Sequence, residues 1–185
     1  MNCTTKKISN IASIVSGVYA SIVPDGDVAY LQMGDFLKGY GACAASKVHA
    51  TGKVQANLLE KGNILFACKG SRYLAVTYNE DVPAVASTVF FVLKVKNNSI
   101  NPEYLCWYLN QPTIKTFFRS IDQGTGVPVI KKMYIENLEI PIPDGDTQRK
   151  IVELSNLSDR EFQLRSAIAG KKHLLLNQKL MNLIE

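Results

Sequence analysis

The chain has 185 residues, of which 46% are hydrophobic and 20% charged, and its formal net charge at pH 7 is +5. This length suits one domain of about 145 residues with a helical extension, and a body of that size can bury a core without disulfide staples. The composition excludes a collagen-like or intrinsically disordered chain, and the mild positive charge favours a polyanionic partner without requiring one.

Cysteine usage and hydropathy restrict the compartment and the chemistry. The four cysteines and two histidines are widely spaced along the chain: Cys3, Cys43, Cys68, Cys106, His49 and His173. This spacing predicts free thiols and no metal site. The apolar run at residues 84–95 contains polar side chains and is too short to span a bilayer, and no apolar stretch of a signal peptide follows the N-terminal lysines. We therefore expect a cytoplasmic protein without a membrane segment.

The N-terminal part of the chain predicts a short amphipathic helix that packs on the body. Residues 8–17 carry apolar side chains at helical spacing, and Gly17 is positioned to end the helix. The spaced apolar residues are Ile8, Ile11, Ala12 and Val15. A turn at residues 24–27 then leads into a predicted strand at residues 28–33.

The middle of the chain predicts a surface segment, a hairpin and a core strand. Residues 34–56 are poor in large apolar side chains and rich in Gly, Ala and Ser, which favours a long irregular segment, either functional or a plain connection. Residues 64–68 and 73–78 predict two strands joined by the tight basic turn of residues 69–72. Residues 84–95 are β-branched and aromatic and predict the main core strand.

Two helices and a last strand are predicted next. Asn101 and Pro102 begin a helix that extends to residue 110, and Pro112 breaks its continuation. Residues 113–120 predict a second helix. Its inward-facing apolar side chains are expected to be Ile114, Phe117 and Phe118. Residues 138–143 alternate apolar residues with proline, which is typical of an edge strand.

A long helix is predicted to follow that strand. Pro143, Asp144 and Gly145 form a turn, and Asp146 is placed to cap the helix. Beyond it the chain has no proline and a single glycine, Gly170, which is the one position where a break is expected. At 1.5 Å per residue the helix would be about 60 Å long.

This helix carries an imperfect coiled-coil seam. Apolar residues at three- and four-residue spacing define it: Leu154, Leu157, Leu164, Ile168 and Leu175. Glu161 and Lys171 occupy seam positions that would otherwise be apolar. Because so long a helix cannot bury its seam on one small body, we predict that these five residues mediate dimerisation.

We find no pattern for catalysis, metal binding or cofactor binding. The sequence has no acidic residue two positions before a lysine, so the metal-dependent nuclease motif is absent. Gly124 and Gly126 lack the third spaced glycine of a dinucleotide-binding loop. The sequence therefore predicts a protein that is not an enzyme, with no catalytic residue, no metal ligand and no cofactor.

The basic residues point instead to DNA. Lys69 and Arg72 flank the tip of the predicted hairpin, and a narrow basic loop can enter a DNA groove, where arginine bonds guanine through two hydrogen bonds. The candidate residues at this loop are Lys69, Ser71, Arg72 and Tyr73. The candidates for phosphate contacts are Lys38, Lys47, Lys53, Arg119, Lys131 and Lys132. In the alternative interpretation these are ordinary solvated charges.

Taken in order, several segments resemble the DNA-specificity (S) subunits of type I restriction-modification systems. The similar segments are residues 8–17, residues 62–66 with the loop at residues 69–73, residues 100–105 with Leu109 and Asn110, residues 124–130, and residues 138–143 with Gln148 and Ile151. The resemblance covers nearly the whole chain and implies an α/β (α+β) fold. A target-recognition-domain-like body at residues 1–143, with a bent mixed sheet and short helices, would precede a long coiled-coil-type helix at residues 144–185.

The resemblance implies a non-catalytic subunit that recognises double-stranded DNA. An S subunit of this family is about twice as long and has two recognition domains, so two copies of this chain would pair through antiparallel helices and read a bipartite palindromic site. The methyltransferase (M) subunit and, as a further partner, the restriction (R) subunit would join this homodimer.

Three alternatives stay open at this point. The chain could be the recognition fragment of a fused restriction-methyltransferase enzyme, a stand-alone regulator or spare recognition cassette exchanged by recombination, or a helix-mediated interaction protein that does not bind DNA. Salt-dependent DNA binding separates the last alternative from the others.

Overall fold

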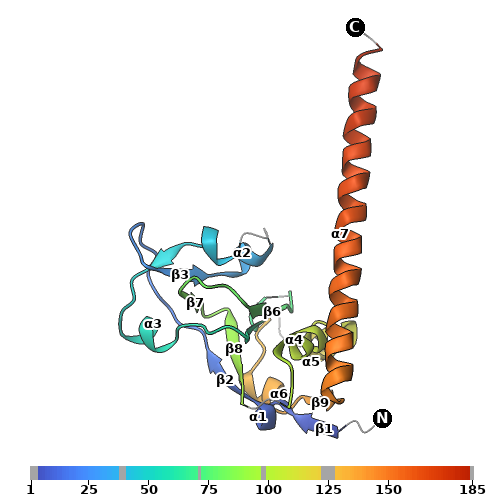
Figure 1. Cartoon of the computed structure of the whole chain (residues 1–185). Helices are drawn as coiled ribbons and strands as arrows, with labels where there is room; N and C mark the ends of the chain where they lie inside the picture. The colour runs from blue at the N-terminus through green and yellow to red at the C-terminus, as the bar shows by residue number, and fades with distance from the viewer. Residues whose placement is uncertain (1–3, 38–40, 71, 97–98, 122–127, 184–185) are drawn as a thin grey trace.

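The computed structural model describes residues 4–37, 41–70, 72–96, 99–121 and 128–183 as a mixed α/β body from which one long helix extends (Figure 1). The strands are β1 (Thr4–Lys7), β2 (Ala12–Ser16), β3 (Val28–Leu31), β4 (Lys47–Val48), β5 (Asn63–Ala67), β6 (Ala75–Tyr78), β7 (Ala84–Ala86), β8 (Phe90–Val95) and β9 (Glu139–Ile142). The helices are α1 (Ile8–Ile11), α2 (Met33–Leu37), a 3-10 turn at Ala42–Ala44, α3 (Gly52–Ala56), α4 (Pro102–Leu109), α5 (Pro112–Ile121), α6 (Lys132–Glu136) and α7 (Gly145–Met181).

The strands form three small sheets. The central sheet is antiparallel and has the order β2-β8-β5-β6. A second sheet has the order β4-β3-β7, with β3 and β7 parallel, and β1 pairs with β9 in a third. The predicted α/β class with a long C-terminal helix is therefore confirmed, but three sheets replace the single bent sheet that the sequence suggested.

The prediction of one core strand at residues 84–95 is wrong. β7 belongs to the second sheet and β8 to the central sheet, and the chain turns between them at Ser87, where the N–H of Phe90 donates to the Ser87 carbonyl oxygen (3.0 Å). Both strands are almost entirely buried. Ser87 and Thr88 stand at the division, but strands tolerate such small polar residues, so the apolar run reads as continuous.

The helix predicted at residues 8–17 is also wrong beyond its first turn. α1 is only four residues long, and the chain continues as β2, which pairs with β8. In β2 the side chains of Ala12 and Ile14 are buried while those of Ser13 and Val15 are exposed. The apolar residues of this segment fit both a period of 3.6 and a period of two, and the tertiary pairing with β8 selects the strand.

The segment at residues 34–56 is more ordered than predicted. Its described residues contain most of α2, the 3-10 turn, β4 and α3, each no longer than five residues. β4 completes the second sheet by pairing with β3. The predicted hairpin, by contrast, is confirmed, because β5 and β6 pair as antiparallel neighbours with Phe66 opposite Ala75.

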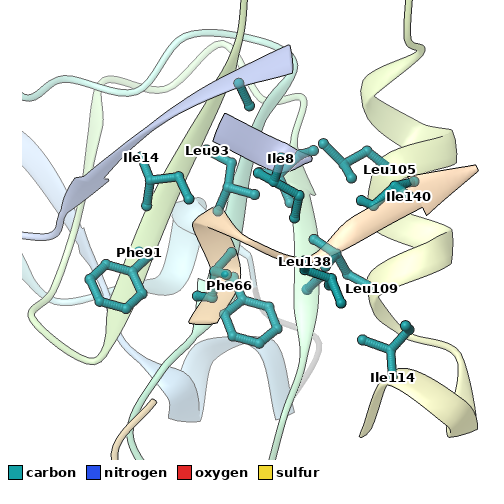
Figure 2. Close-up of a cluster of buried hydrophobic side chains, with 14 of the residues drawn as sticks. Ile8, Ile14, Phe66, Phe91, Leu93, Leu105, Leu109, Ile114, Leu138 and Ile140 are labelled. Carbon is teal, nitrogen blue, oxygen red and sulfur yellow. The ribbon is translucent and has the colours of Figure 1, made fainter. Parts of the chain in front are cut away.

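The largest core lies between the central sheet, α4 and the last strand. Figure 2 shows side chains from these elements gathered together, among them Phe66, Phe91 and Leu93 from the sheet and Leu105 and Leu109 from α4. α4 begins as predicted, since the side chain of Asn101 accepts a hydrogen bond from the Glu103 N–H. α5 also forms, and its side chains Ile114 and Phe118 are buried as predicted. Phe117 was predicted to face inward as well, but 40% of its surface is exposed.

The base of α7 is fixed by two polar side chains. Asp144, rather than the predicted Asp146, caps the helix by accepting from the Thr147 N–H (2.9 Å), and hydrogen bonds from the Thr147 backbone and hydroxyl lower the pKa of the Asp144 carboxyl. Gln148 is 2% exposed. Its side-chain oxygen accepts from the Asn101 N–H (2.7 Å), and its NH₂ group donates to the carbonyl oxygens of Ser99 (3.1 Å) and Pro143 (2.8 Å).

Beyond its base α7 projects away from the body. The helix has 37 residues, which corresponds to about 55 Å, and it continues through Gly170 without a break. Gln148 and Val152 are its buried residues. The five seam residues are all exposed, by 49% to 68% of their surface. The body therefore covers the first two turns of α7 and leaves the apolar seam open.

Replacing Gln148 with alanine tests the connection between body and helix. Gln148→Ala removes a buried amide and leaves the partly buried Asn101 N–H and two carbonyl oxygens without this partner, so we expect the free energy of unfolding to fall by about 1–3 kcal/mol. Gln178→Ala is the matched control, because its side chain is exposed on the same helix and its loss should cost less than about 0.5 kcal/mol. Urea unfolding of both variants measures the difference, and equal stabilities would contradict this role for Gln148.

Candidate nucleic-acid interface

The loop between β5 and β6 is held against a second segment of the chain. Lys69 forms an isolated antiparallel bridge with Val129. The N–H of Gly70 donates to the Pro128 carbonyl oxygen (2.8 Å), and the N–H of Ile130 donates to the Cys68 carbonyl oxygen (2.8 Å). Gly70 has φ +91°, a conformation that glycine adopts without strain. The loop is therefore fixed at its base by backbone bonds rather than free along its length.

The side chains predicted at this loop have different environments. Lys69 and Arg72 are exposed, and Ser71 lies outside the described residues. Tyr73 is only 5% exposed, and its ring packs 6.0 Å from that of Phe118, centroid to centroid. A ring in the core cannot stack on or contact DNA bases, so we correct the prediction for Tyr73 and assign it to the core.

Three of the predicted phosphate contacts lie near this loop. Arg119 follows Phe118 on α5, and the Phe118 ring packs on that of Tyr73 at the end of the loop (6.0 Å between centroids). Lys131 and Lys132 follow directly after the segment that pairs with the loop, and both are exposed. Lys132 forms an ion pair with Glu136 (3.4 Å). The fold thus brings together basic residues that are up to 63 positions apart in sequence (from 69 to 132).

The remaining predicted contacts form a second group. Lys47 in β4 and Lys53 in α3 are exposed on the other sheet and its neighbouring helix, and Lys38 lies outside the described residues. Across the described part of the chain, neither lysine forms an ion pair, nor do Lys69, Arg72, Arg119 or Lys131. Exposed cations without carboxylate partners are available to bind phosphates.

Sequence reasoning missed a hollow between these two groups. It is bordered by residues 19–22, the end of β3 and the turn between β7 and β8. Tyr19 and Ile22 are exposed there, 83% and 54% of their surface respectively. In the sequence the only signal was a pair of large apolar residues, Tyr19 and Ile22, in a segment without helix or strand periodicity. No local pattern relates this pair to the residues near position 88.

Two cysteines in the described part of the chain have thiols whose pKa is raised. Burial raises the pKa of the Cys68 thiol even though Lys69 is adjacent, and burial likewise raises the pKa of Cys106. Within the ranges that the structure describes, no cluster of three or more His, Cys, Asp or Glu side chains has the arrangement of a metal site. The same part of the chain has no helix that is both long and apolar enough to span a membrane.

Comparison with known proteins identifies the family. The profile of the family described as "Type I restriction modification DNA specificity domain" matches residues 4–168. The chain belongs to this family. The resemblance that the order of its segments suggested is therefore confirmed over most of the body and about two-thirds of α7.

A curated relative is similar over most of this chain. The type I restriction enzyme HindI specificity subunit of Haemophilus influenzae is 28% identical over 148 residues, which are 77% of this chain and 32% of the relative. The aligned region thus spans about a third of that subunit's length.

Solved structures share the fold. A chain in a structure on complex assembly and conformational transition of the type I R-M system has a TM-score of 0.68 at 16% identity, covering 91% of this chain and 41% of that one. The S subunit from M. genitalium has a TM-score of 0.60 at 15% identity, covering 88% of this chain and 40% of that one. At these identities the likeness establishes the fold alone. The match covers about two-fifths of each of the two solved chains.

Proposed function

We propose that this chain is the non-catalytic, sequence-specific DNA recognition subunit of a type I restriction-modification complex. The observation that carries the proposal is the match of the family profile to residues 4–168. Residues 1–143 would be the DNA target recognition domain and residues 144–185 the helix for dimerisation and partner docking. The two groups of exposed cations on the body, all but Lys132 without an ion pair among the described residues, support this assignment, since duplex DNA presents a dense array of phosphates to such cations.

The contacts divide by the chemistry of their side chains. Lys69 and Arg72, on the loop held by residues 128–130, would contact base edges in the major groove. The remaining exposed cations would bind phosphates and set the position of the duplex: Lys47, Lys53, Arg119, Lys131 and Lys132. Lys38 and Ser71 stay predictions outside the described residues.

The exposed seam of α7 supports pairing with a second copy. Five large apolar residues without a covering partner in the described chain are a typical coiled-coil surface. The helix is also asymmetric in charge: residues 145–163 contain four acidic and three basic residues, whereas residues 164–183 contain four basic and no acidic ones. Antiparallel pairing places the basic half of each helix against the more acidic half of the other.

One antiparallel register pairs four of the five seam residues with one another and also pairs the two charged interruptions. If Leu164 faces Ile168 of the second copy, then Leu157 faces Leu175 and Glu161 faces Lys171. In the single chain the Glu161 carboxylate bonds Arg165 instead (2.6 Å), and both side chains are solvent-exposed. A cross-helix Glu161–Lys171 pair would therefore favour this register and orientation over others more than it would add stability.

The homodimer would place two identical recognition bodies at opposite ends of the paired helices. Identical bodies related by a two-fold axis read identical half-sites, so the target would be a bipartite palindrome with an unread spacer. The paired helices would bind the methyltransferase (M) subunit, which supplies cofactor and chemistry, and the complex would recruit the restriction (R) subunit. Sequencing the methylated bases of the host genome with and without the gene tests this function, and identical methylation patterns would refute it.

The isolated chain should have no activity of its own. We expect purified protein to transfer no methyl group from labelled cofactor to DNA and to cleave neither DNA nor ATP, because its sequence has no motif for these reactions. The matched measurement adds the methyltransferase subunit of the same host. Methyl transfer by the chain alone would refute the non-catalytic assignment.

Removing both loop cations tests the division between base and phosphate contacts. Lys69→Ala with Arg72→Ala should weaken binding to the target by about 1–3 kcal/mol per lost base contact and binding to unrelated DNA much less. The control Lys172→Ala with Lys179→Ala removes the same charge from the distal part of α7. Affinities are measured on target and unrelated duplexes at one salt concentration. Equal losses on both duplexes would make the loop a phosphate contact instead.

Charged substitutions in the seam test the homodimer. We expect the wild type to be a dimer at micromolar concentration, and Leu164→Asp with Ile168→Asp to give a folded monomer, because four carboxylates would meet in adjacent layers. Leu176→Asp with Leu180→Asp is the matched control, since these leucines are equally exposed but lie outside the seam. Sedimentation measures the mass. A wild type that is monomeric at tens of micromolar would exclude the homodimer and leave pairing with a different subunit.

Charge reversal tests the register. Glu161→Lys should weaken the dimer, and Glu161→Lys combined with Lys171→Glu should restore it, because the facing pair is then reversed rather than broken. If the combined variant is no better than the single one, Glu161 and Lys171 do not face each other.

A further inference from the structure

The hollow between residues 19–22 and the turn after β7 is built by a close backbone approach. A Cβ atom on Gly17 would lie 2.1 Å from the Ser87 carbonyl oxygen, so only glycine lets the chain pass here. The N–H of Gly17 then donates to the Phe90 carbonyl oxygen (2.9 Å), and that of Val18 to the Ala86 carbonyl oxygen (2.9 Å). These bonds fix residues 19–22 beside the turn and leave a hollow of about 720 Å³ between them.

The lining of this hollow is neutral and combines apolar, aromatic and polar side chains. Its lining residues, all of them within the described ranges, carry no charge. Gln32 at the end of β3 contributes an amide, and Thr88 in the turn contributes a hydroxyl and a methyl group. Ser87 is 5% exposed, and its hydroxyl has no hydrogen-bond partner among the described residues. A buried hydroxyl without a partner can bond a water molecule or a polar group that enters the hollow.

These side chains match base edges better than phosphates. The glutamine amide can form two hydrogen bonds with adenine, and the threonine methyl group can contact the thymine methyl group. The exposed ring of Tyr19 adds an apolar face of the kind on which bases and sugars pack. A phosphate site would instead need a cation or a set of N–H groups, and the hollow is lined by no cationic side chain.

Cations stand on both sides of the hollow. Tyr19 and Ser21 also line a second hollow of about 410 Å³, which is bordered by His49 and Lys53. On the opposite side, the Val89 carbonyl oxygen accepts from the Cys68 N–H (2.9 Å), so the turn adjoins the residue that precedes Lys69. A neutral surface between two basic ones is the arrangement expected where base edges lie between phosphate contacts.

We propose that this hollow is a base-contacting site for duplex DNA, in which Gln32 and Thr88 read A·T base pairs and Tyr19 packs beside them. The inference rests on the proposed function and extends it, because it places base readout on the turn after β7 as well as on the loop of Lys69. Specificity is then shared between a basic loop that suits guanine and a neutral hollow that suits adenine and thymine.

Selection from a random duplex library tests the site with the full chain. The variants are Gln32→Ala, Thr88→Ser, which removes the methyl group but keeps the hydroxyl, and Tyr19→Ala. Gln55→Ala is the matched control, because this glutamine is exposed on α3 and does not line the hollow. The melting temperature of each variant is measured alongside the selection. Because Tyr19 is exposed, Tyr19→Ala is the variant expected to destabilise the body least.

We expect the wild type and Gln55→Ala to select one motif that contains A·T pairs. Gln32→Ala and Thr88→Ser should lose the base preference at one or two of those pairs and bind the motif about tenfold more weakly, with unchanged affinity for unrelated DNA. Tyr19→Ala should weaken binding to the motif in the same selective way.

The contrary results separate this inference from the proposed function. If the wild type selects a motif and all three variants select the same motif with the same affinity, the hollow is not a base-contacting site and the proposed function stands. If the variants lose affinity equally for every duplex, the hollow binds the DNA backbone and the assignment to bases is overturned. If the wild type selects no motif, the proposed function fails and the base-contacting site with it.

Discussion

The side-chain amide of Gln148 connects the body to the base of α7 through hydrogen bonds. It bonds the Asn101 N–H and the carbonyl oxygens of Ser99 and Pro143, so one buried group joins the start of α4, the segment before it and the end of β9. A buried amide whose donors and acceptor are all paired has a single favourable arrangement. The direction in which α7 leaves the body, and with it the position of its seam, therefore depends on this residue.

Local signals in the sequence specified the elements that depend on short-range chemistry. Asn101 followed by Pro102 marked the start of α4, and the alternation of apolar residues with proline marked β9. Long-range pairing decided the others. The apolar run that contains β7 and β8 reads as one strand because both halves are buried, although they enter different sheets. Residues 12–16 form a strand because β8 is available to pair with them.

The candidate site was only partly visible in the sequence for the same reason. Exposed cations could be recognised one by one, but their division into two groups follows from the bridge between Lys69 and Val129, which no local pattern encodes. Tyr73 directly follows the polar residues Ser71 and Arg72 in sequence, yet its ring packs on Phe118, 45 positions away (73 to 118). The hollow depends on three separate segments meeting near Ser87. It thus emerges only after the sheets have assembled.

The pairing of β1 with β9 has a mechanical and architectural consequence. Thr4 lies opposite Ile142 and Lys7 opposite Glu139, so the strand that begins the body and the strand that ends it run side by side next to the base of α7 (Figure 1). A module whose two ends are adjacent can be transplanted into another helical scaffold without stretching either connection. Its interior can also diverge freely while the junction stays constant. Hybrids that keep the helical scaffold and change the surface presented to DNA would best be joined at this pair of strands.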